Sequence, residues 1–487
     1  MNKFQIIILF FCLSVDISIA QSENKKPNIL LIFTDDQQWN TVGALGNPHI
    51  KTPNLDKLAE GAFVFNNAYC FGGNSGAVCI PSRNMLMSGR NFFRFEEDIR
   101  SIEAQGGQTR KIVLTNPDWP TIPKTLKAAG YETYYREKSG SSNNPIVRTQ
   151  FDHFKDINQV DALRTGRPAQ GIVNDAITFL NEERDNTKPF FMYLGIPAPH
   201  DPRWSLKKFR DMYDQEKMPL PENYRPQHEW DIGSMTIRDE KLEAWPRSKE
   251  AIKRHIYDYY SVISAMDYDL GRLLDELDKL RLVENTIVIF TSDQGLAVGQ
   301  HGLMGKQNIY EGTMKVPFIV KGPGIKKDKS DALIYLHDIF PTLCEYAGTT
   351  IPEKLDGVSF AEITRGKEKK AEIRRNLLLA YMNFQRSVRD DRWKLMHFPK
   401  INKTMLYDLK NDPFEKENQA YNPKYAKKIE KMFVQLEIEC KVAGDIIELF
   451  PGEVQSADFI APLEKMETYY PAGGLAPGDP SYIEKGK

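Results

Sequence analysis

Strand-like and helix-like segments alternate along most of this 487-residue chain, and this rhythm constrains its fold more than any other feature. The apolar run NILLIFTD at 28–35 is typical of a buried strand, and the helically spaced TPNLDKLAEGA follows it. The same alternation recurs in WPTIPKTLKAAGYETYY, in AITFLNEE with PFFMYLGIPAPHDP, and in DYDLGRLLDELDKLRLVENTIVIFTSDQG. It predicts an α/β fold in which a mostly parallel sheet is sandwiched by helices.

The pattern changes after about residue 370. RNLLLAYMNFQRSVRDDRWKLMHF alternates apolar and polar residues, MLYDLKNDPFEKEN turns the chain, and YAKKIEKMFVQLEIECKVA has helical spacing. We therefore expect a large α/β domain over 21–370 and a smaller C-terminal subdomain over 371–487, with a short antiparallel sheet, a helix and a tail. The segment 200–255 has no clear period and is interpreted as a long insertion near a functional site.

The N-terminus has the order of a secretory signal peptide over residues 1–20. Lys3 precedes the apolar run FQIIILFFCLSV, and the small-residue sequence SIA ends at Ala20. The run is shorter than the ~20 residues that a membrane-spanning helix needs. We expect an exported protein, periplasmic or secreted, with no membrane span.

The overall charge excludes some partners. Lysine and arginine number 65 and aspartate and glutamate 66, so the chain has no basic excess. A nucleic-acid partner or a polybasic membrane surface is not expected from this balance.

Acidic residues stand where two predicted strands end. Asp35 and Asp36 close the first strand, and Asp293 and Gln294 follow TIVIFTS. Ligands of open α/β sheets bind at the carboxyl ends of the strands, where these oxygen atoms would converge. All-oxygen donors suit a hard divalent cation, calcium or magnesium, better than zinc. The alternative is that Asp35 and Asp36 simply cap a following helix.

The cysteines raise a separate question. Removal of the signal peptide leaves Cys70, Cys79, Cys344 and Cys440, which in an oxidising compartment suggest two disulfides. Cys79 stands at an expected helix start with Arg83 one turn on, where a thiolate would be stabilised. A hard-oxygen metal site is a poor partner for a thiolate. Either Cys79 is converted into another group, or the two clusters are unrelated.

The segment CIPSRNMLMSGR resembles the signature of the type I sulfatases, Cys-x-Pro-Ser-Arg followed by Leu-x-Thr-Gly-Arg, with Ser88 in place of threonine. The resemblance extends over nearly the whole mature chain, including PNILLIFTDDQ, TSDQGLAVGQHGLMGKQNIYEGTMKVPFIVKGPG, LHDIFPTLCEYAG and LYDLKNDPFEKEN. These enzymes are formylglycine-dependent and alkaline-phosphatase-like in fold. The chain is most similar to the exported bacterial polysaccharide sulfatases.

The resemblance implies a set of site residues. Cys79 would be oxidised by a formylglycine-generating maturase to Cα-formylglycine, whose hydrate is the nucleophile. One calcium ion would be held by Asp35, Asp36, Asp293 and Gln294. Arg83 would stabilise the hydrate. Charge on the sulfuryl group would be offset by Lys138 and Lys306, and the leaving oxygen would be protonated by His200 or His301. Each histidine also has a simpler interpretation as a solvated or capping loop residue.

One position departs from the family pattern. Relatives usually carry Gly-Lys-Trp-His after the strand that corresponds to GYETYY, and this histidine helps to release sulfate. Here Lys138 keeps the lysine, and Gly140 stands where the histidine is expected. Either another base, such as a nearby serine or a bound water, takes its part, or turnover is slow.

Three functions remain open on the sequence. The first is a sulfatase that hydrolyses sulfate esters of a sulfated poly- or oligosaccharide. The second is a phosphoester or phosphonate hydrolase of the same fold. The third, prompted by Gly140, is a non-catalytic relative that binds sulfated glycan or calcium.

Overall fold

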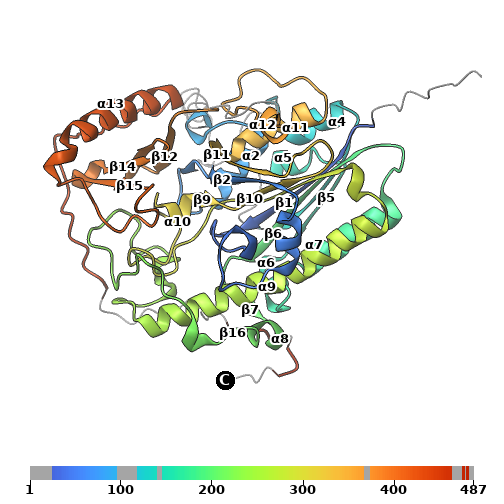
Figure 1. The fold of residues 1–487 in the computed structure, drawn as a ribbon, viewed down its shortest axis with the longest axis horizontal. Helices are drawn as coiled ribbons and strands as arrows, with labels where there is room; N and C mark the ends of the chain where they lie inside the picture. Colours follow the sequence, from blue (N-terminus) through green and yellow to red (C-terminus); the bar gives the residue numbers. More distant parts are fainter. Residues whose placement is uncertain are drawn as a thin grey trace, which may run out of the picture.

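A computed structural model describes residues 25–95, 118–139, 145–366, 373–462, 474–477 and 479–481 (Figure 1). Its main feature is a nine-stranded sheet with the order β11-β2-β10-β8-β1-β6-β4-β5, in which β9 pairs with β2. The strands are β1 (Asn28–Asp35), β2 (Phe63–Tyr69), β4 (Glu132–Lys138), β5 (His153–Ile157), β6 (Phe190–Pro199), β8 (Thr286–Ser292), β9 (Lys315–Val316), β10 (Phe318–Lys321) and β11 (Asp328–Tyr335).

Most neighbours in this sheet are parallel. β1 lies between β6 and β8, β4 between β5 and β6, and all four pairings are parallel, as is that of β2 with β11. β10 runs antiparallel to β2 and β8, and β9 runs antiparallel to β2. The expectation of a mostly parallel sheet is therefore confirmed.

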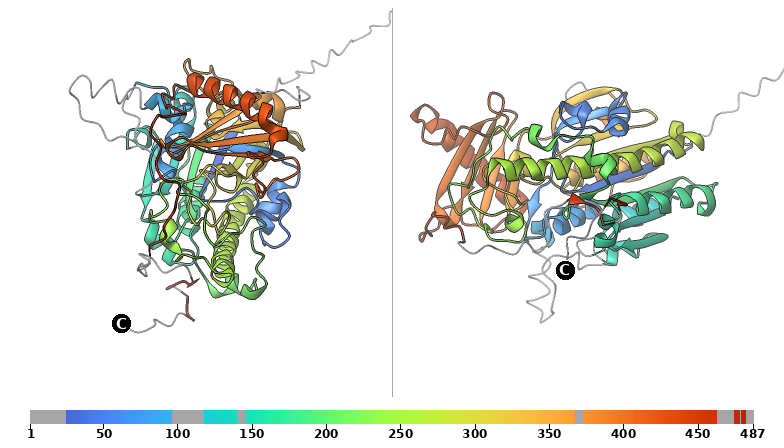
Figure 2. Two further views of the ribbon diagram at one scale, coloured as in Figure 1. Left: turned by 90° about the vertical axis from the view of Figure 1, so that its left-hand side faces the viewer. Right: turned by 90° about the horizontal axis from the view of Figure 1, so that it is seen from below.

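Helices cover both faces of the sheet, because β1 is apolar on both sides. Leu30 and Ile32 point into one core, and Ile29, Leu31 and Phe33 into the other. The first core is closed by α1 (Pro53–Ala59), α7 (Gln170–Thr178) and α9 (Lys249–Lys279). The second is closed by α2 (Cys79–Ser88), α4 (Ile122–Ala128) and α11 (Ile339–Tyr346). Figures 1 and 2 show the long α9 running along one face.

A second sheet lies at one end of the molecule, where α13 (Ala426–Ala443) packs on it (Figure 2). Its antiparallel strands are β12 (Leu377–Tyr381), β13 (Gln385–Arg389), β14 (Trp393–Phe398) and β15 (Lys403–Asp408). This confirms the expected antiparallel sheet and helix. A fifth strand, β3 (Gly72–Gly73), joins β12 in parallel and ties the sheet to the segment just before α2.

Gly72 makes that junction possible. Its φ of 120° is disfavoured for other residues, and a Cβ atom there would stand 1.8 Å from the Ala380 carbonyl oxygen. The strands β3 and β12 can approach this closely only over a glycine.

The segment 200–255 is largely irregular, as expected. It contains the short elements β7 (Trp204–Ser205) and α8 (Lys207–Arg210), and it leads into α9. The remaining short elements are α5 (Pro145–Arg148), α6 (Gln159–Arg164), α10 (Glu311–Met314), α12 (Ala361–Thr364) and β16 (Gly474–Leu475).

Four cysteines of the described chain are free and buried: Cys70, Cys79, Cys344 and Cys440. The alternative of two disulfides is therefore wrong.

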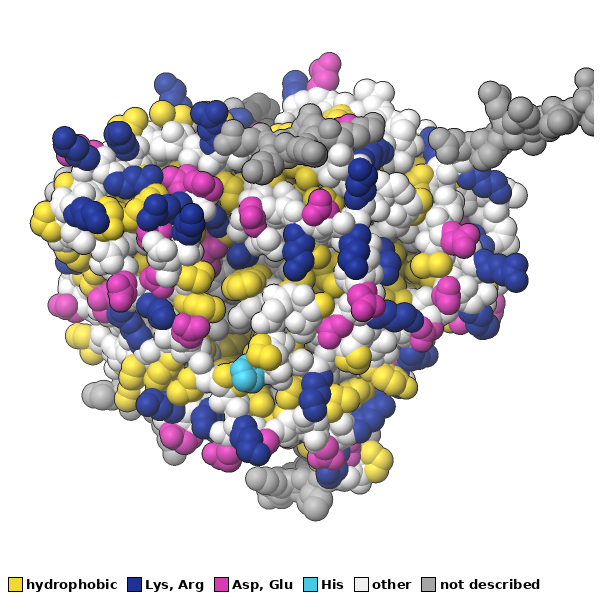
Figure 3. Space-filling model, viewed as in Figure 1, with side chains coloured by type: hydrophobic (Ala, Val, Ile, Leu, Met, Phe, Trp, Pro, Cys, Tyr) yellow, Lys and Arg dark blue, Asp and Glu magenta, His cyan; other side chains and the backbone are white. Residues whose placement is uncertain are grey.

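Three expectations concern residues outside the described ranges: the signal peptide at 1–20, the domain boundary at 370/371, and Gly140. Within the described ranges, no helix is both long and apolar enough to cross a membrane. Acidic and basic side chains are interspersed over the face in Figure 3, in keeping with the balanced composition.

Candidate active site

Four neighbouring parallel strands end at one edge of the large sheet, and the predicted site residues meet there. Asp35 is the last residue of β1 and Lys138 the last of β4. Asp293 directly follows β8, and His200 directly follows β6. The order β8-β1-β6-β4 places these ends side by side.

The acidic residues form a compact, buried set. One ligand atom each from Asp35, Asp36, Cys79 and Asp293 lies within 4.8 Å of all the others. Asp36 has a φ of 67°. Its backbone N–H donates to Asp293 Oδ1 at 3.0 Å, and the N–H of Gln294 donates to the same oxygen at 2.9 Å. The backbone thus holds the carboxylates in place.

Gln294 supplies an unused oxygen to this set. Its Nε2 atom donates to Asp36 Oδ1 at 2.6 Å and lies 3.2 Å from Cys79 Sγ. Its Oε1 atom is buried and has no hydrogen-bond partner among the described residues. An orphaned buried acceptor beside three carboxylates is what a hard cation would satisfy. The residues present fit an oxygen-liganded divalent metal.

Cys79 is the first residue of α2, and every recorded hydrogen-bond contact of its side chain is with a polar group. Its thiol donates to Asp35 Oδ1 at 3.3 Å, and the Lys306 Nζ atom lies 3.0 Å from the sulfur. Burial, then Asp293 and Asp35, raise the pKa of the Cys79 thiol well above its usual value. A thiolate nucleophile is disfavoured here, whereas an oxygen-bearing derivative would find donors and acceptors around it.

Arg83 lies one helical turn beyond Cys79, is fully buried and contacts three carboxylates. Its Nη2 atom donates to Asp35 Oδ2 at 3.0 Å and to Asp293 Oδ2 at 2.9 Å. Its Nη1 atom forms a close ion pair with Glu137. Burial opposes its charge, but these carboxylates, Glu137 first, raise the pKa of Arg83 well above its usual value.

Two buried lysines complete the cluster. Lys138 pairs with Asp35, and the Nζ atom of Lys306 donates to the two Asp36 carboxylate oxygens at 2.9 and 3.0 Å. Burial alone would lower both lysine pKa values, but Asp35 raises that of Lys138 and Asp36 that of Lys306. Both ammonium groups remain charged.

The carboxylates differ in protonation behaviour. Burial alone would raise the pKa of Asp35, but Lys138 and Arg83 hold it well below its usual range. Burial and the neighbouring Asp35 raise the pKa of Asp293 to about 6. Four carboxylates face three cations, which leaves the cluster with one net negative charge: Asp35, Asp36, Glu137 and Asp293 against Arg83, Lys138 and Lys306. A divalent ion would make the net charge positive and favour an anionic ester.

The two candidate histidines have different positions. His200 Nε2 lies 3.7 Å from Asp36 Oδ2, and its Nδ1 atom lies 2.7 Å from the Asp201 carbonyl oxygen. His301 is stacked on Tyr310 with 3.8 Å between ring centroids and contacts Asn223 at 2.9 Å. The structure brings His200 to the cluster, whereas the recorded contacts of His301 lie elsewhere.

The cluster opens into a pocket of about 360 Å³. Cys79, His200 and Lys306 line this pocket together with residues of the irregular segment and of α6. The other lining residues are Gly76, Ala77, Gln159, Val160, Asp201, Pro202, Ile237, Arg238, Asp239 and Gln307. The insertion expected near a functional site therefore borders this pocket.

Two residues of this site, Glu137 and Arg238, were not predicted from the sequence. Glu137 holds Arg83, and the Tyr193 hydroxyl donates to the same carboxylate at 2.7 Å. The place of Glu137 beside Lys138 at the end of β4 was a usable signal that Glu137 belongs to the site. Arg238 pairs with Asp201 and donates to Asp239 Oδ1 at 2.6 Å. This arginine lies in a segment without a period, so no local pattern could reveal it.

Comparison with known proteins agrees with this geometry. The family model described as Sulfatase matches residues 27–349, which span both the strand ends and α2. The chain belongs to the sulfatase family. A second model, N-sulphoglucosamine sulphohydrolase, C-terminal, matches residues 299–441 of this sulfatase. As a member of the family, it is a sulfuric ester hydrolase.

The sulfatase resembles curated relatives over most of its length. It is 27% identical to the N-acetylglucosamine-6-O-sulfatase of Bacteroides thetaiotaomicron, covering 86% of this chain and 87% of that one. It is 29% identical to an ulvan-active sulfatase of Formosa agariphila, covering 90% of this chain and 84% of that one. A protein solved in complex with its substrate D-glucosamine-2-N,6-O-disulfate shares the fold, with a TM-score of 0.68 and 24% identity. The match covers 86% of this chain and 98% of that one. The expected alkaline-phosphatase-like sulfatase fold is confirmed.

Proposed function

We propose that this sulfatase hydrolyses sulfate esters of a sulfated poly- or oligosaccharide outside the cytoplasm. The observation that carries the proposal is the buried cluster around Cys79, which opens into a pocket with Lys306 and His200 at its floor. The names of the relatives support a glycan, because they act on N-acetylglucosamine sulfate or on ulvan. The expected signal peptide supports an extracytoplasmic site of action.

We further propose that residue 79 works as Cα-formylglycine, installed by a maturase, beside one calcium ion. Asp35, Asp36, Asp293 and Gln294 would hold the ion, and the free Gln294 Oε1 atom supports this ligand set. When bound, the ion would offset negative charge on the sulfuryl oxygens, and the hydrated aldehyde would supply the nucleophilic oxygen.

Three cations of the chain prepare the site for an anionic ester. Arg83 is held by Asp35, Asp293 and Glu137, so its guanidinium needs no rearrangement during the reaction. Lys306 borders the pocket and can contact the sulfuryl oxygens, while Lys138 lies deeper against Asp35. These fixed charges favour the transition state, in which negative charge shifts toward the leaving oxygen.

His200 is the proposed proton donor to that leaving oxygen. Its Nδ1 atom faces the Asp201 carbonyl oxygen at 2.7 Å, which makes Nδ1 the donor and leaves Nε2 to carry the transferred proton. Asp36 and Asp201 lie 3.7 and 3.4 Å from the ring nitrogens and would compensate the charge of the protonated ring. His301 has no part in this proposal.

Two measurements test the proposal. Mass spectrometry of the tryptic peptide that contains residue 79, after expression with a maturase, is expected to find the aldehyde. The modified protein is expected to release sulfate from sulfated oligosaccharides, and Cys79→Ala is expected to abolish release. Faster turnover of the matching phosphate esters would favour a phosphoester hydrolase. Aldehyde formation and calcium binding without any turnover would favour a non-catalytic relative.

A further inference from the structure

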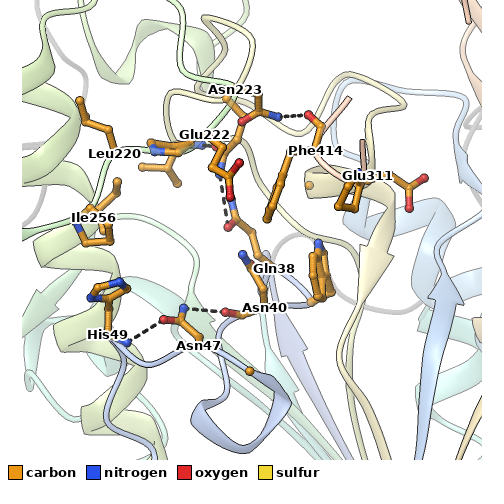
Figure 4. A pocket seen from close by; sticks show the side chains of 18 of the residues that line it. Gln38, Asn40, Asn47, His49, Leu220, Glu222, Asn223, Ile256, Glu311 and Phe414 are labelled. Carbon is orange, nitrogen blue, oxygen red and sulfur yellow. Dashed lines mark hydrogen bonds between the residues drawn. The ribbon is translucent and has the colours of Figure 1, made fainter. Parts of the chain in front are cut away.

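A second cavity of about 360 Å³ lies beside the loop that follows β1. It is formed by the loops 38–49 and 219–223, the first half of α9, residues 298–300 and 311–312, and the turn at 413–415. It shares no lining residue with the catalytic pocket. Figure 4 shows Leu220 and Ile256 on one side and Phe414 on the other. A volume in this range is typical of small-molecule sites.

The walls combine aromatic surface with side-chain amides. Trp39 and Phe414 line the cavity, and Lys315, which lies 4.3 Å from the centroid of the Trp39 ring, holds that ring in place. Gln38, Asn40, Asn47, Asn223 and Gln300 contribute the amides. Flat apolar rings with directional donors and acceptors match a ligand that has both apolar faces and hydroxyl groups.

Two of these amides have unused hydrogen-bonding capacity. The Oδ1 atom of Asn223 is buried without a partner among the described residues, while its Nδ2 atom donates to the Phe414 carbonyl oxygen at 2.7 Å. The side-chain amide of half-buried Asn40 makes no hydrogen bond within the described part of the chain, and only the backbone carbonyl oxygen of Asn40 accepts from Asn47 Nδ2, at 2.7 Å. A buried acceptor without a partner is costly, and a ligand hydroxyl would satisfy it.

The charges around the cavity favour a neutral ligand. Its described lining contains no lysine or arginine, so an anionic sulfate group has no counter-charge on the walls. The carboxylates of the lining are already compensated: Lys394 binds Glu311 at 3.0 Å and Glu415 at 2.8 Å, and Lys416 binds Glu222 at 2.9 Å. A cation would therefore gain little as well.

We propose that this cavity is a second carbohydrate-binding site, which accepts a neutral, unsulfated sugar residue. The site would hold a sugar ring against Trp39 and Phe414, with hydroxyl groups on Asn40 and Asn223. It does not depend on the proposed catalytic chemistry, because none of its lining residues lines the catalytic pocket. On a long glycan it would hold an uncharged part of the chain and raise the effective concentration of the sulfated part.

The test uses the full mature protein and a panel of glucose, galactose, mannose, xylose, rhamnose and N-acetylglucosamine. Binding is measured by saturation-transfer NMR and by titration of tryptophan fluorescence, with inorganic sulfate present to occupy the catalytic pocket. We expect at least one neutral sugar to bind in the millimolar range without displacement by sulfate. Cys79→Ala is expected to keep this binding, which separates the second site from the catalytic proposal.

Three variants locate the binding. Trp39→Ala removes the aromatic wall and Asn40→Trp fills the cavity from a half-buried position, and each is expected to weaken binding about tenfold or more. Tyr421→Ala removes an aromatic side chain that is 69% exposed outside both cavities and is expected to change nothing. The proposal is overturned if no sugar of the panel binds, if sulfate displaces the sugar, or if Asn40→Trp binds as well as the parent.

Discussion

The Nζ atom of Lys306 lies 3.0 Å from the Sγ atom of Cys79, and the two side chains are almost completely buried. Lys306 comes from the loop after β8 and Cys79 from the start of α2, 227 residues apart in the sequence. A fixed ammonium group this close to residue 79 would stabilise negative charge on any group transferred to that residue.

Replacing Lys306 with alanine is expected to reduce kcat for a sulfate ester by about 10²- to 10³-fold, because one preorganised donor is lost. Lys306→Arg should recover part of this loss. Lys329→Ala, at an exposed lysine on β11, serves as the control. An unchanged kcat in Lys306→Ala, with the melting temperature retained, would remove Lys306 from the proposed mechanism.

Glu137→Gln tests the support of Arg83. The change leaves a buried guanidinium with one charged partner fewer, and breaking such a pair typically costs about 3–5 kcal/mol. We expect a lower midpoint of denaturant unfolding and a kcat reduced about 100-fold through misplacement of Arg83. Glu132→Gln, on the same strand, breaks the half-buried contact with His153 at 2.9 Å and should cost less than about 1 kcal/mol. Equal costs in the two variants would contradict a special role for Glu137.

Gln294→Leu tests the metal site. Removal of the unpartnered Oε1 atom should weaken calcium binding at least about tenfold, measured by calorimetry and by the calcium-dependent rise in melting temperature. Gln159→Leu, a change in the lining of the catalytic pocket and outside the ligand set, should leave calcium binding intact. Chelation of the parent protein is expected to lower its melting temperature to that of the variant. A calcium titration that Gln294→Leu leaves unaltered would refute the ligand set.

Gly72→Ala tests the pairing of β3 with β12. A Cβ atom 1.8 Å from the Ala380 carbonyl oxygen forces β3 and β12 apart, so the free energy of unfolding should fall by more than about 3 kcal/mol. Gly171→Ala, within α7 and without neighbours within 4 Å, should instead stabilise the protein by about 0.5–1 kcal/mol. Denaturant unfolding of both variants checks the contrast, and a neutral Gly72→Ala would disprove the close approach.

His337→Phe tests the acid sensitivity of the core. Burial lowers the pKa of His337 to about 4, and the ring stacks on Tyr335 with 4.8 Å between centroids. The folded state keeps this imidazole neutral, whereas the unfolded state takes up a proton below about pH 6.5, so stability is lost as the pH falls from 6.5 to 4.

For one group the loss reaches about 3 kcal/mol. His337→Phe keeps a stacked ring without the proton, and its unfolding free energy should depend less on pH in this window. His49→Gln, at an exposed histidine, should follow the parent. Parallel pH profiles of parent and His337→Phe would count against the buried neutral ring.

Local patterns were enough to predict the strands and helices and the residues at strand ends. The doubly apolar β1, the acidic pair after it and the motif around Cys79 are contiguous in the sequence, so periodicity and motif expose them. Neighbouring parallel strands also end at one edge, which brought Asp35 and Asp293 together.

Contacts between distant segments were decided by tertiary packing alone. The ion pair of Arg238 with Asp201 and the burial of His301 against Tyr310 each join side chains whose local sequence carries no sign of the partner. The position of Glu137 at the end of β4 was visible in the sequence, but its ion pair with Arg83 was not. The pairing of β3 with β12 is of the same kind, because it depends on a backbone approach that only Gly72 permits. The sequence by itself determined which chemical groups stand at the strand ends, since that depends on local periodicity. The tertiary structure decided which of them are held together in a buried site of paired charges, since that depends on the packing of segments far apart in the chain.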